Sequence, residues 1–218
     1  MESQKRKSVL QCNLLMWVAI VLTAGLLSLA SSKNVMAAME MELPVFSEQG
    51  GFYQKSFNLT LTSDPGTQIY YTLDGSEPDS SSSLYKSPIT LTPAQLSQSP
   101  MLSGSGTGGT PYMNAVVVKA KAIGSQGESK TATNTYFIDS AKSFSVPVMS
   151  LSMEPEDFVG GRGMYSNPGN KDLTPQTFIE YFNSDGTLGF KHSAQVKISG
   201  HASRGARKKS LRINFRKG

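Results

Sequence analysis

The sequence predicts a mostly β protein, with an export segment followed by two β-rich parts. Residues 67–74 alternate in character along an extended strand. Ile69, Tyr71 and Leu73 share one face, and such alternation is typical of a strand with one face in a core. An Asp-Gly pair follows and Pro78 then ends strand pairing, so we expect a hairpin turn there. With 38% hydrophobic residues, 20 Gly and 11 Pro, the composition suits a β-rich protein with many turns.

The first part, residues 43–139, holds this strand and four others. The four are expected at 57–63, 87–92, 115–123 and 130–138. The segment between Pro93 and Met113 is poor in apolar residues and rich in Gly and Ser, which predicts a surface loop. Such a long loop is either an insertion without a function of its own or a binding loop.

Residues 1–37 have the organisation of a secretory signal peptide. A basic start precedes seventeen uncharged residues from Leu14 to Ala30, and a short polar segment leads to Val35-x-Ala37. We therefore expect signal cleavage after Ala37. The alternative is an uncut signal anchor, through which alone the chain would contact a membrane. Both interpretations place the rest of the chain outside the cytoplasm, secreted or at the cell surface.

The cysteine and charge patterns exclude several classes of protein. Cys12 is the only cysteine and lies in the predicted signal, so we expect no disulfide, cysteine nucleophile or Cys-based zinc site. The formal net charge of +5 falls to +2 when residues 1–37 are removed. Residues 200–218 hold seven basic residues and no acidic one, which leaves −5 on residues 38–199. Because the basic character is local, we do not predict nucleic-acid binding.

The second part, residues 146–218, follows a linker at 140–145. Its strands are expected at 146–152, 177–182, 189–198 and 211–215, with a helical turn at 155–158. Turn residues separate the second and third of these strands, which predicts a hairpin.

The strand expected at 177–182 is apolar on both faces. Phe178 and Phe182 lie on one face, with Ile179 and Tyr181 on the other. Strands buried on both sides have this character, so we expect a central strand or an interface here.

Several separated motifs in the first part resemble the chitobiase/β-hexosaminidase C-terminal-type domain. They are Gly50 to Tyr53, Phe57 to Leu61, the run IYYTLDGSEP from Ile69 to Pro78, Tyr85 to Ile89, Val118 to Ala122, and Ser129 to Phe137. The resemblance implies a small immunoglobulin-like β-sandwich. Such a sandwich is usually an accessory module of secreted proteins and is not itself catalytic.

The second part resembles the entry into a CotH-type protein. Its motifs are Pro147 to Leu151, Gly163 to Asn170, Ile179 to Phe182 with Asp185-Gly186, Val196 to Gly200, Ser203-Arg204, and Lys208 to Phe215. The resemblance implies an exported, bacterial, spore-coat-type atypical kinase. Such a kinase transfers phosphate from ATP to serine with the help of Mg²⁺.

In that interpretation, Arg204, Lys208 and Lys209 would face the nucleotide, because basic residues often meet phosphates. Lys209, next to Ser210 at the start of a strand, is the first choice. The alternative is a solvated strand edge whose basic residues discourage aggregation.

The acidic residues of such a kinase are expected further along than this chain reaches. Carboxylates hold the metal in phosphoryl transfer, and no Asp or Glu follows Gly200. We therefore expect a portion truncated at the start of the kinase domain, inactive by itself, with no catalytic residue, metal site or cofactor. ATP and Mg²⁺ are implied only for the complete family domain, and a downstream kinase domain would be the partner.

Other chemistry-bearing residues have simpler explanations. Asp74, Glu77 and Asp79 carry carboxylates that suit Ca²⁺, but their spacing matches no EF-hand loop and a turn explains it. Gly160 to Gly163 lacks the lysine of a phosphate loop, and neither histidine has a carboxylate at metal-ligand spacing.

Three functions remain open from the sequence. The first is an exported, non-catalytic N-terminal portion of a CotH-like kinase. The second is a binding or adhesion module that contacts polysaccharide or a coat protein at the cell surface. The third is a membrane-anchored structural spacer.

Overall fold

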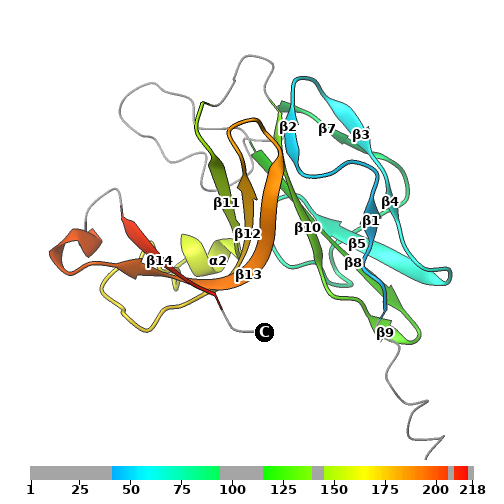
Figure 1. Ribbon diagram of the computed structural model, residues 1–218. Coiled ribbons are helices and arrows are strands. Elements are labelled where there is room, and N and C mark those ends of the chain that lie inside the picture. Colours follow the sequence, from blue (N-terminus) through cyan, green and yellow to red (C-terminus); the bar gives the residue numbers. More distant parts are fainter. Residues whose placement is uncertain (1–40, 94–114, 139–144, 206–208, 216–218) are drawn as a thin grey trace, which may run out of the picture. The chain divides into compact units, whose positions relative to one another are not determined.

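The computed structural model describes residues 41–93, 115–138, 145–205 and 209–215 (Figure 1). The predicted signal peptide with Ala37, most of the predicted loop before Met113, most of the linker 140–145, and Lys208 lie outside the described residues. Residues 41–218 belong to one unit. The mostly β fold class is confirmed, because every regular element except two short helical turns is a strand in the part described.

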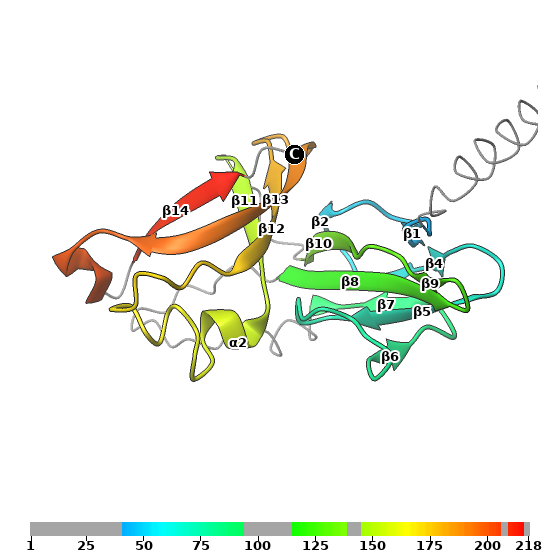
Figure 2. The same ribbon diagram turned by 90° about the horizontal axis from the view of Figure 1, so that it is seen from below.

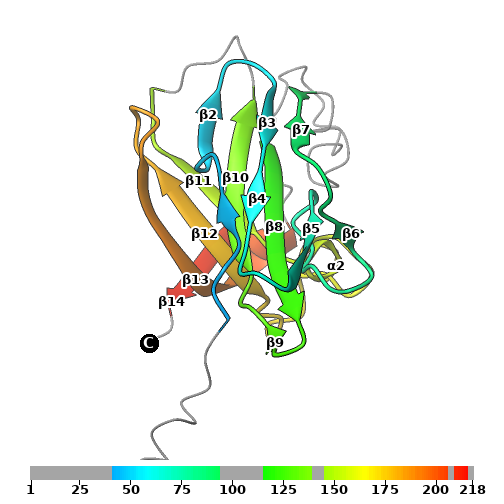
Figure 3. The same ribbon diagram turned by 90° about the vertical axis from the view of Figure 1, so that its right-hand side faces the viewer.

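A large sheet forms the centre of the first part (Figure 3). Its strands, in spatial order, are β2 (Gly51–Tyr53), β10 (Ala132–Ile138), β8 (Ala115–Gly124), β5 (Thr67–Thr72) and β6 (Ser83–Leu84), with β9 (Gly127–Glu128) on β8. The β2–β10 pair is parallel and the other pairs are antiparallel. β8 is the long central strand, since β10 pairs along one side of it and β5 along the other.

Two small sheets complete the sandwich. They are β1 (Val45–Phe46) with β4 (Leu61–Thr62), and β3 (Phe57–Leu59) with β7 (Ile89–Leu91). The strand predicted at 57–63 is thus divided at Thr60, where the chain passes from one small sheet to the other. The Thr60 backbone N–H donates to the Ser47 hydroxyl at 3.0 Å, and its carbonyl accepts from the Ser47 N–H at 2.9 Å. These bonds hold the crossing point.

The core of the sandwich lies between its sheets. Its fully buried members include Leu59, Leu91, Val118, Ile138 and Tyr136. Ile69, Tyr71 and Leu73 all contact this core, as their alternation predicts. The buried Tyr136 hydroxyl donates to the Glu48 carbonyl at 2.8 Å, and burial raises the pKa of this phenol well above its usual value.

The turn after β5 is wider than a tight hairpin. Gly75 has φ of 84°, which only glycine adopts easily, so the prediction of a turn at the Asp-Gly pair is confirmed. The Asp74 carboxylate accepts from the Ser76 N–H at 3.0 Å and from its hydroxyl at 2.6 Å. The chain returns only at β6, where Leu84 pairs with Tyr70. Glu77 lies in the loop between β5 and β6.

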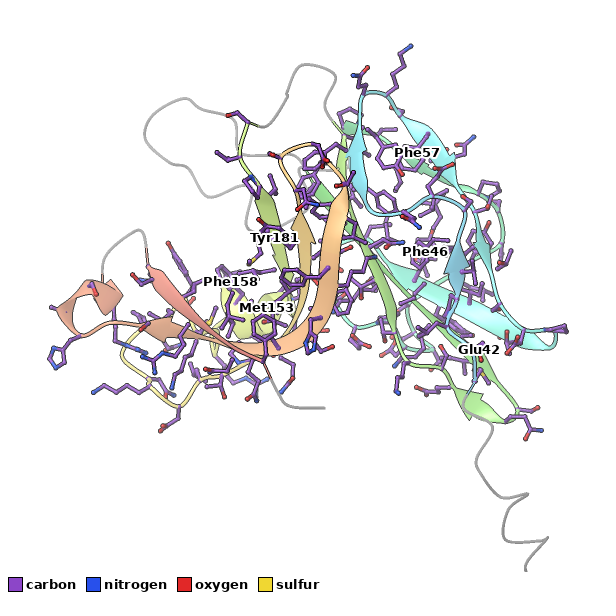
Figure 4. All side chains as sticks on the ribbon, in the orientation of Figure 1. Glu42, Phe46, Phe57, Met153, Phe158 and Tyr181 are labelled. Carbon is purple, nitrogen blue, oxygen red and sulfur yellow. The ribbon has the colours of Figure 1, made fainter. Side chains whose placement is uncertain are left out.

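The second part is a four-stranded antiparallel sheet (Figure 2). Its order is β11 (Val148–Ser152), β12 (Gln176–Phe182), β13 (Leu188–Ser199) and β14 (Ser210–Phe215). The helical turn α2 (Pro155–Phe158) follows β11, and the 3-10 turn η2 (Ala202–Gly205) follows β13. In Figure 4, Met153 and Phe158 lie close to each other at the start of this part, and they pack with the buried Met164, Val196 and Ile198.

β12 is a central strand with two buried faces, as its sequence predicts. Ile179 is 0% exposed on one face, and Phe182 is 0% exposed on the other. Phe182 meets two rings of the first part: the ring centroids lie 5.6 Å from Phe52 and 5.5 Å from Phe137, both edge to face. Edge-to-face aromatic pairs stabilise beyond their area burial. β12 therefore packs on β10 of the sandwich.

Within the described residues, no helix is both long and apolar enough to cross a membrane.

Candidate functional site

A cleft of about 440 Å³ is the candidate site. Its lining residues are Glu77, Lys119, Lys121, Ser129, Lys130, Thr131, Thr133, Ser152, Gln176, Thr177, Phe178 and Ser193. One wall comes from the sandwich and the other from the second sheet. The lining combines lysines, one carboxylate, one amide, several hydroxyls and a single aromatic ring.

Strand alternation on β8 places the lysines of the first wall. Val118, Ala120 and Ala122 fill the core, so Lys119 and Lys121 point out of the opposite face of the sheet. The side chain of Lys119 is only 8% exposed, and that of Lys121 is 16% exposed. Two cations are thus held at the base of the wall, where little water reaches them.

Glu77 neutralises part of this charge. Its carboxylate lies 3.3 Å from the Lys119 ammonium and 3.9 Å from that of Lys121. The Thr131 hydroxyl donates to the same carboxylate. Lys121 also lies 3.4 Å from Glu128, which does not line the cleft. The wall therefore offers ammonium donors and carboxylate acceptors side by side.

The second wall comes from neighbouring strands β11, β12 and β13. Phe178 is half-buried, and it is paired in register with Ser152 on one side and Ser193 on the other. Gln176 is exposed at the start of β12. Thr177 is 4% exposed, and its hydroxyl has no hydrogen-bond partner among the described residues. This wall supplies one apolar ring surrounded by hydroxyl and amide groups.

A buried ion pair of the second sheet is hydrogen-bonded to β10 of the sandwich and so helps to join the two walls. Glu180 on β12 is 1% exposed, and its Oε1 lies 3.1 Å from the Lys191 ammonium, although not in hydrogen-bond geometry. Its Oε2 accepts from the Thr135 hydroxyl of the sandwich at 2.5 Å. Lys191 also donates to the Thr133 carbonyl at 3.1 Å and to the Asn134 side chain. This network spans β10, β12 and β13.

A second tie joins the loop that carries Glu77 to the second part of the chain. The Glu154 carboxylate, just before α2, accepts from the backbone N–H of Glu77. The loop that carries Glu77 is therefore fixed to the second part as well as to the sandwich lysines. Loss of the contact between the two parts would open the cleft.

Arg204 occupies a structural position instead of facing open solvent. It is 9% exposed, and its guanidinium donates to the carbonyls of Pro168 at 2.5 Å, Asn170 at 3.1 Å and Ile198. Two of these carbonyls lie in the loop between α2 and β12, and the third lies on β13. This geometry gives no support to the expected contact between Arg204 and a nucleotide.

Lys209 lies close to Arg204 but apart from the cleft. Its ammonium donates to the Arg204 carbonyl at 2.9 Å and lies 4.6 Å from the centre of the Tyr165 ring, a cation–π contact. Lys208 lies outside the described residues, so the three basic residues predicted to meet a nucleotide cannot be placed around one site. Nucleotide binding by them stays a prediction.

Asp74 and Asp79, the other two calcium candidates in the sequence, accept hydrogen bonds from nearby turn residues. Asp79 accepts from the Ser81 N–H at 2.8 Å and from its hydroxyl at 2.6 Å, and these bonds to Ser81 hold the pKa of the Asp79 carboxyl below its usual value. No group of three or more His, Cys, Asp or Glu side chains could hold a metal ion in the residues the structure describes.

The cleft itself was missed by sequence reasoning. The sequence singles out Glu77 only as a calcium candidate, and Lys119 and Lys121 only within a resemblance. The alternation of these lysines with small apolar residues indicates that they face away from the core. That pattern does not show that Phe178, which is distant in sequence, lies opposite them.

Comparison with known proteins supports the first resemblance. Residues 48–98 match the family model described as chitobiase/beta-hexosaminidase C-terminal domain. This match covers β2 to β7 and the loop that carries Glu77. No curated protein and no solved structure shows significant similarity to the chain. The resemblance of residues 146–218 to CotH-type proteins receives no support from these comparisons.

Proposed function

We propose that this chain is a non-catalytic binding module of an exported protein, and that its cleft holds a segment of polysaccharide. The observation that carries the proposal is the cleft lining, which combines a half-buried aromatic ring with paired lysine and carboxylate groups. Sugars present apolar ring faces and closely spaced hydroxyls, so an aromatic ring beside polar donors and acceptors suits them.

The polar groups of the cleft match the needs of a sugar hydroxyl. A hydroxyl both donates and accepts hydrogen bonds, and the Lys119–Glu77 pair offers a donor and an acceptor 3.3 Å apart. Gln176 offers both roles in one side chain. Phe178 supplies an apolar surface for the face of a sugar ring.

The family match also supports a binding function. The domain type is named after enzymes that act on amino-sugar chains, and the resemblance implies that it serves as an accessory module. Domains of this type are often extracellular, in agreement with the predicted signal peptide. A coat protein is the alternative partner at such a location.

A second candidate function is the exported N-terminal portion of a CotH-like kinase. It is supported by the order of short motifs in residues 146–218 and by the basic residues around β14, of which Arg212 is exposed on the strand itself. In this function the cleft would bring the downstream kinase domain to its substrate. ATP and Mg²⁺ would bind in that downstream domain.

Affinity electrophoresis of the full chain tests the binding function. We expect slower migration in a gel that contains polysaccharide, with glycol chitin, polygalacturonate and dextran as probes. Phe178→Ala should abolish the retardation, whereas Phe190→Ala should preserve it. Phe190 is the matched control because it is 41% exposed and lies outside the cleft. Equal migration in all gels would contradict polysaccharide binding.

A further inference from the structure

We infer that the cleft selects an uncharged glycan, one whose polar groups are hydroxyls or amides rather than carboxylates, sulfates or amines. This inference rests on the proposed binding function and adds the chemical class of the ligand. It follows from the balance of charge at the cleft, from the pairing of two of its lysines, and from the uncharged groups of the second wall.

The charges at the cleft are balanced. Three lysines and one glutamate carry the charges of the lining: Lys119, Lys121, Lys130 and Glu77. Two further carboxylates bind groups of this wall, since Glu128 lies 3.4 Å from the Lys121 ammonium and Glu154 accepts from the backbone N–H of Glu77. Three ammonium groups thus stand beside three carboxylates in the part of the chain that the structure describes. A charged ligand of either sign meets no surplus of opposite charge here.

The two β8 lysines are already engaged in ion pairs. The Glu77 carboxylate lies 3.3 Å from the Lys119 ammonium and 3.9 Å from the Lys121 ammonium, and it also accepts from the Thr131 hydroxyl. An anion that approached either ammonium would also approach this carboxylate, and like charges repel. An anionic group would therefore lose its hydration in the cleft without gaining an unpaired cation from these two lysines.

Uncharged hydroxyls can bind the same wall without breaking its ion pairs. An ammonium has several donors and a carboxylate has several acceptor positions, so one ion pair does not use all of them. The side chain of Glu77 is 48% exposed, so its carboxylate remains accessible to a ligand. Hydrogen bonds to ionised groups are stronger than those between neutral groups. This wall therefore favours a ligand that adds hydrogen bonds but no charge.

The second wall contributes hydrogen-bonding groups without charge. The described residues that line the cleft from this sheet are Ser152, Gln176, Thr177, Phe178 and Ser193. Gln176 and Ser193 are exposed, and each of their side chains can both donate and accept a hydrogen bond. An ionic group would find no charged partner on this side of the cleft, whereas the hydroxyl and amide groups of an uncharged sugar find both donors and acceptors.

Isothermal titration of the full chain with matched polymers tests the inference. Glycol chitin and carboxymethyl chitin share one backbone and differ in the charge of their substituents, and hydroxyethyl cellulose and carboxymethyl cellulose form a second such pair. We expect the neutral member of at least one pair to bind roughly tenfold more tightly, with an affinity that changes little as salt is added. Glycol chitosan, which carries amines, should bind more weakly than glycol chitin in high salt.

Phe178→Ala assigns binding to the cleft. The basic residues at 200–218 can attract acidic polymers elsewhere on the chain. Binding at that end would persist in Phe178→Ala, because Phe178 lines the cleft. Only the binding that this variant loses is therefore compared between polymers.

A single substitution outside the cleft should change the selection. Glu128→Gln removes one carboxylate partner of Lys121 and leaves a positive surplus beside the cleft. We expect this variant to bind the carboxymethyl polymer several-fold more tightly and the neutral polymer as before. Glu48→Gln is the matched control, because Glu48 and Glu128 are both exposed and lie outside the lining. The circular dichroism spectrum and melting temperature of each variant would show that it remains folded.

The outcomes separate the inference from the proposed function. Equal or tighter binding of the charged polymers, lost in Phe178→Ala, would overturn the selection for uncharged glycans and leave the polysaccharide function intact. The same conclusion would follow if Glu128→Gln and Glu48→Gln had equal effects on the affinity for the carboxymethyl polymer. If no polymer showed binding that depends on Phe178, both the inference and the proposed function would be overturned.

Discussion

Lys191 lies directly opposite Glu180 on neighbouring strands, with its ammonium 3.1 Å from a carboxylate that is only 1% exposed. The pair sits where the second sheet meets β10 of the sandwich, and Thr135 of β10 completes it. A buried charge requires a partner. The contact between the two parts therefore depends on the ion pair that neutralises the Glu180 carboxylate.

We predict that Lys191→Met strongly destabilises the protein. The substitution leaves the Glu180 carboxylate buried without its cation, and breaking a buried pair in this way costs about 3–5 kcal/mol. Urea unfolding followed by circular dichroism measures the change. Lys197→Met, on the same strand and also half-buried, is the control and should cost much less. Recovery in the double variant with Glu180→Met would attribute the loss to the unpaired charge.

We predict that Gly50→Ala destabilises the contact between the two parts. A Cβ atom at Gly50 would lie 2.9 Å from the Glu180 carboxylate and 3.0 Å from the Thr135 carbonyl oxygen. Overpacking of a filled interior costs about 1–3 kcal/mol. Gly51→Ala is the matched control, since its Cβ would meet nothing within 4 Å. Equal unfolding midpoints for the two variants would contradict this account of Gly50.

We predict that Arg204→Lys lowers stability although the charge is kept. The guanidinium reaches three carbonyl groups at once, and a lysine ammonium cannot reproduce that planar arrangement. Each carbonyl left without a donor costs about 1–3 kcal/mol. Thermal unfolding measures the loss, with Arg212→Lys on the exposed strand β14 as the control. An unchanged melting temperature for Arg204→Lys would show that water replaces the lost donors.

We predict that the 218-residue chain transfers no phosphate from ATP, with either Mg²⁺ or Mn²⁺. Phosphoryl transfer needs carboxylates that hold the metal, and the basic residues near β14 supply only positive charge. The assay uses radiolabelled ATP and a serine-rich acceptor. Labelled acceptor that disappears in Lys209→Ala would show that the chain already contains a working kinase. Any weak ATP binding should fall with added salt.

We predict that residues 43–139 fold alone, whereas residues 146–218 are only marginally stable alone. Separation would expose Phe182 and the buried Glu180 carboxylate in the second fragment. In the first fragment the core around Leu59 and Tyr136 would remain complete. Thermal melting of each fragment tests this. A cooperative transition for a soluble, monomeric 146–218 fragment would contradict the prediction.

The sequence predicts strands well where one local pattern decides them. The alternation in 67–74 and the two apolar faces of 177–182 both lead to the observed strands β5 and β12. The division of 57–63 at Thr60 was missed, because it depends on hydrogen bonds to Ser47, which no local pattern shows. Nor does a local pattern show that β8 is the central strand of the large sheet, because that position depends on its pairing with β10 and β5. The stronger turn signal in the sequence follows β5.

The candidate site was harder to predict than the fold. Its residues come from a loop, from β8 and β10, and from three strands of the second sheet. The packing of the second sheet on the sandwich brings Phe178 into the same cleft as Lys121. The basic residues near the end of the sequence form the denser charge cluster, but Arg204 is directed at backbone carbonyls.

The parallel pairing of β2 with β10 has a mechanical consequence. Gly51 to Tyr53 lie beside Tyr136 to Ile138, and both strands run in the same direction. Tension that pulls the chain before β2 and the chain after β10 in opposite directions therefore acts along the strands, in shear. Hydrogen bonds loaded in shear must break together, whereas those of a peeled hairpin break one after another. A chain pulled from these two sides would therefore resist extension at this strand pair.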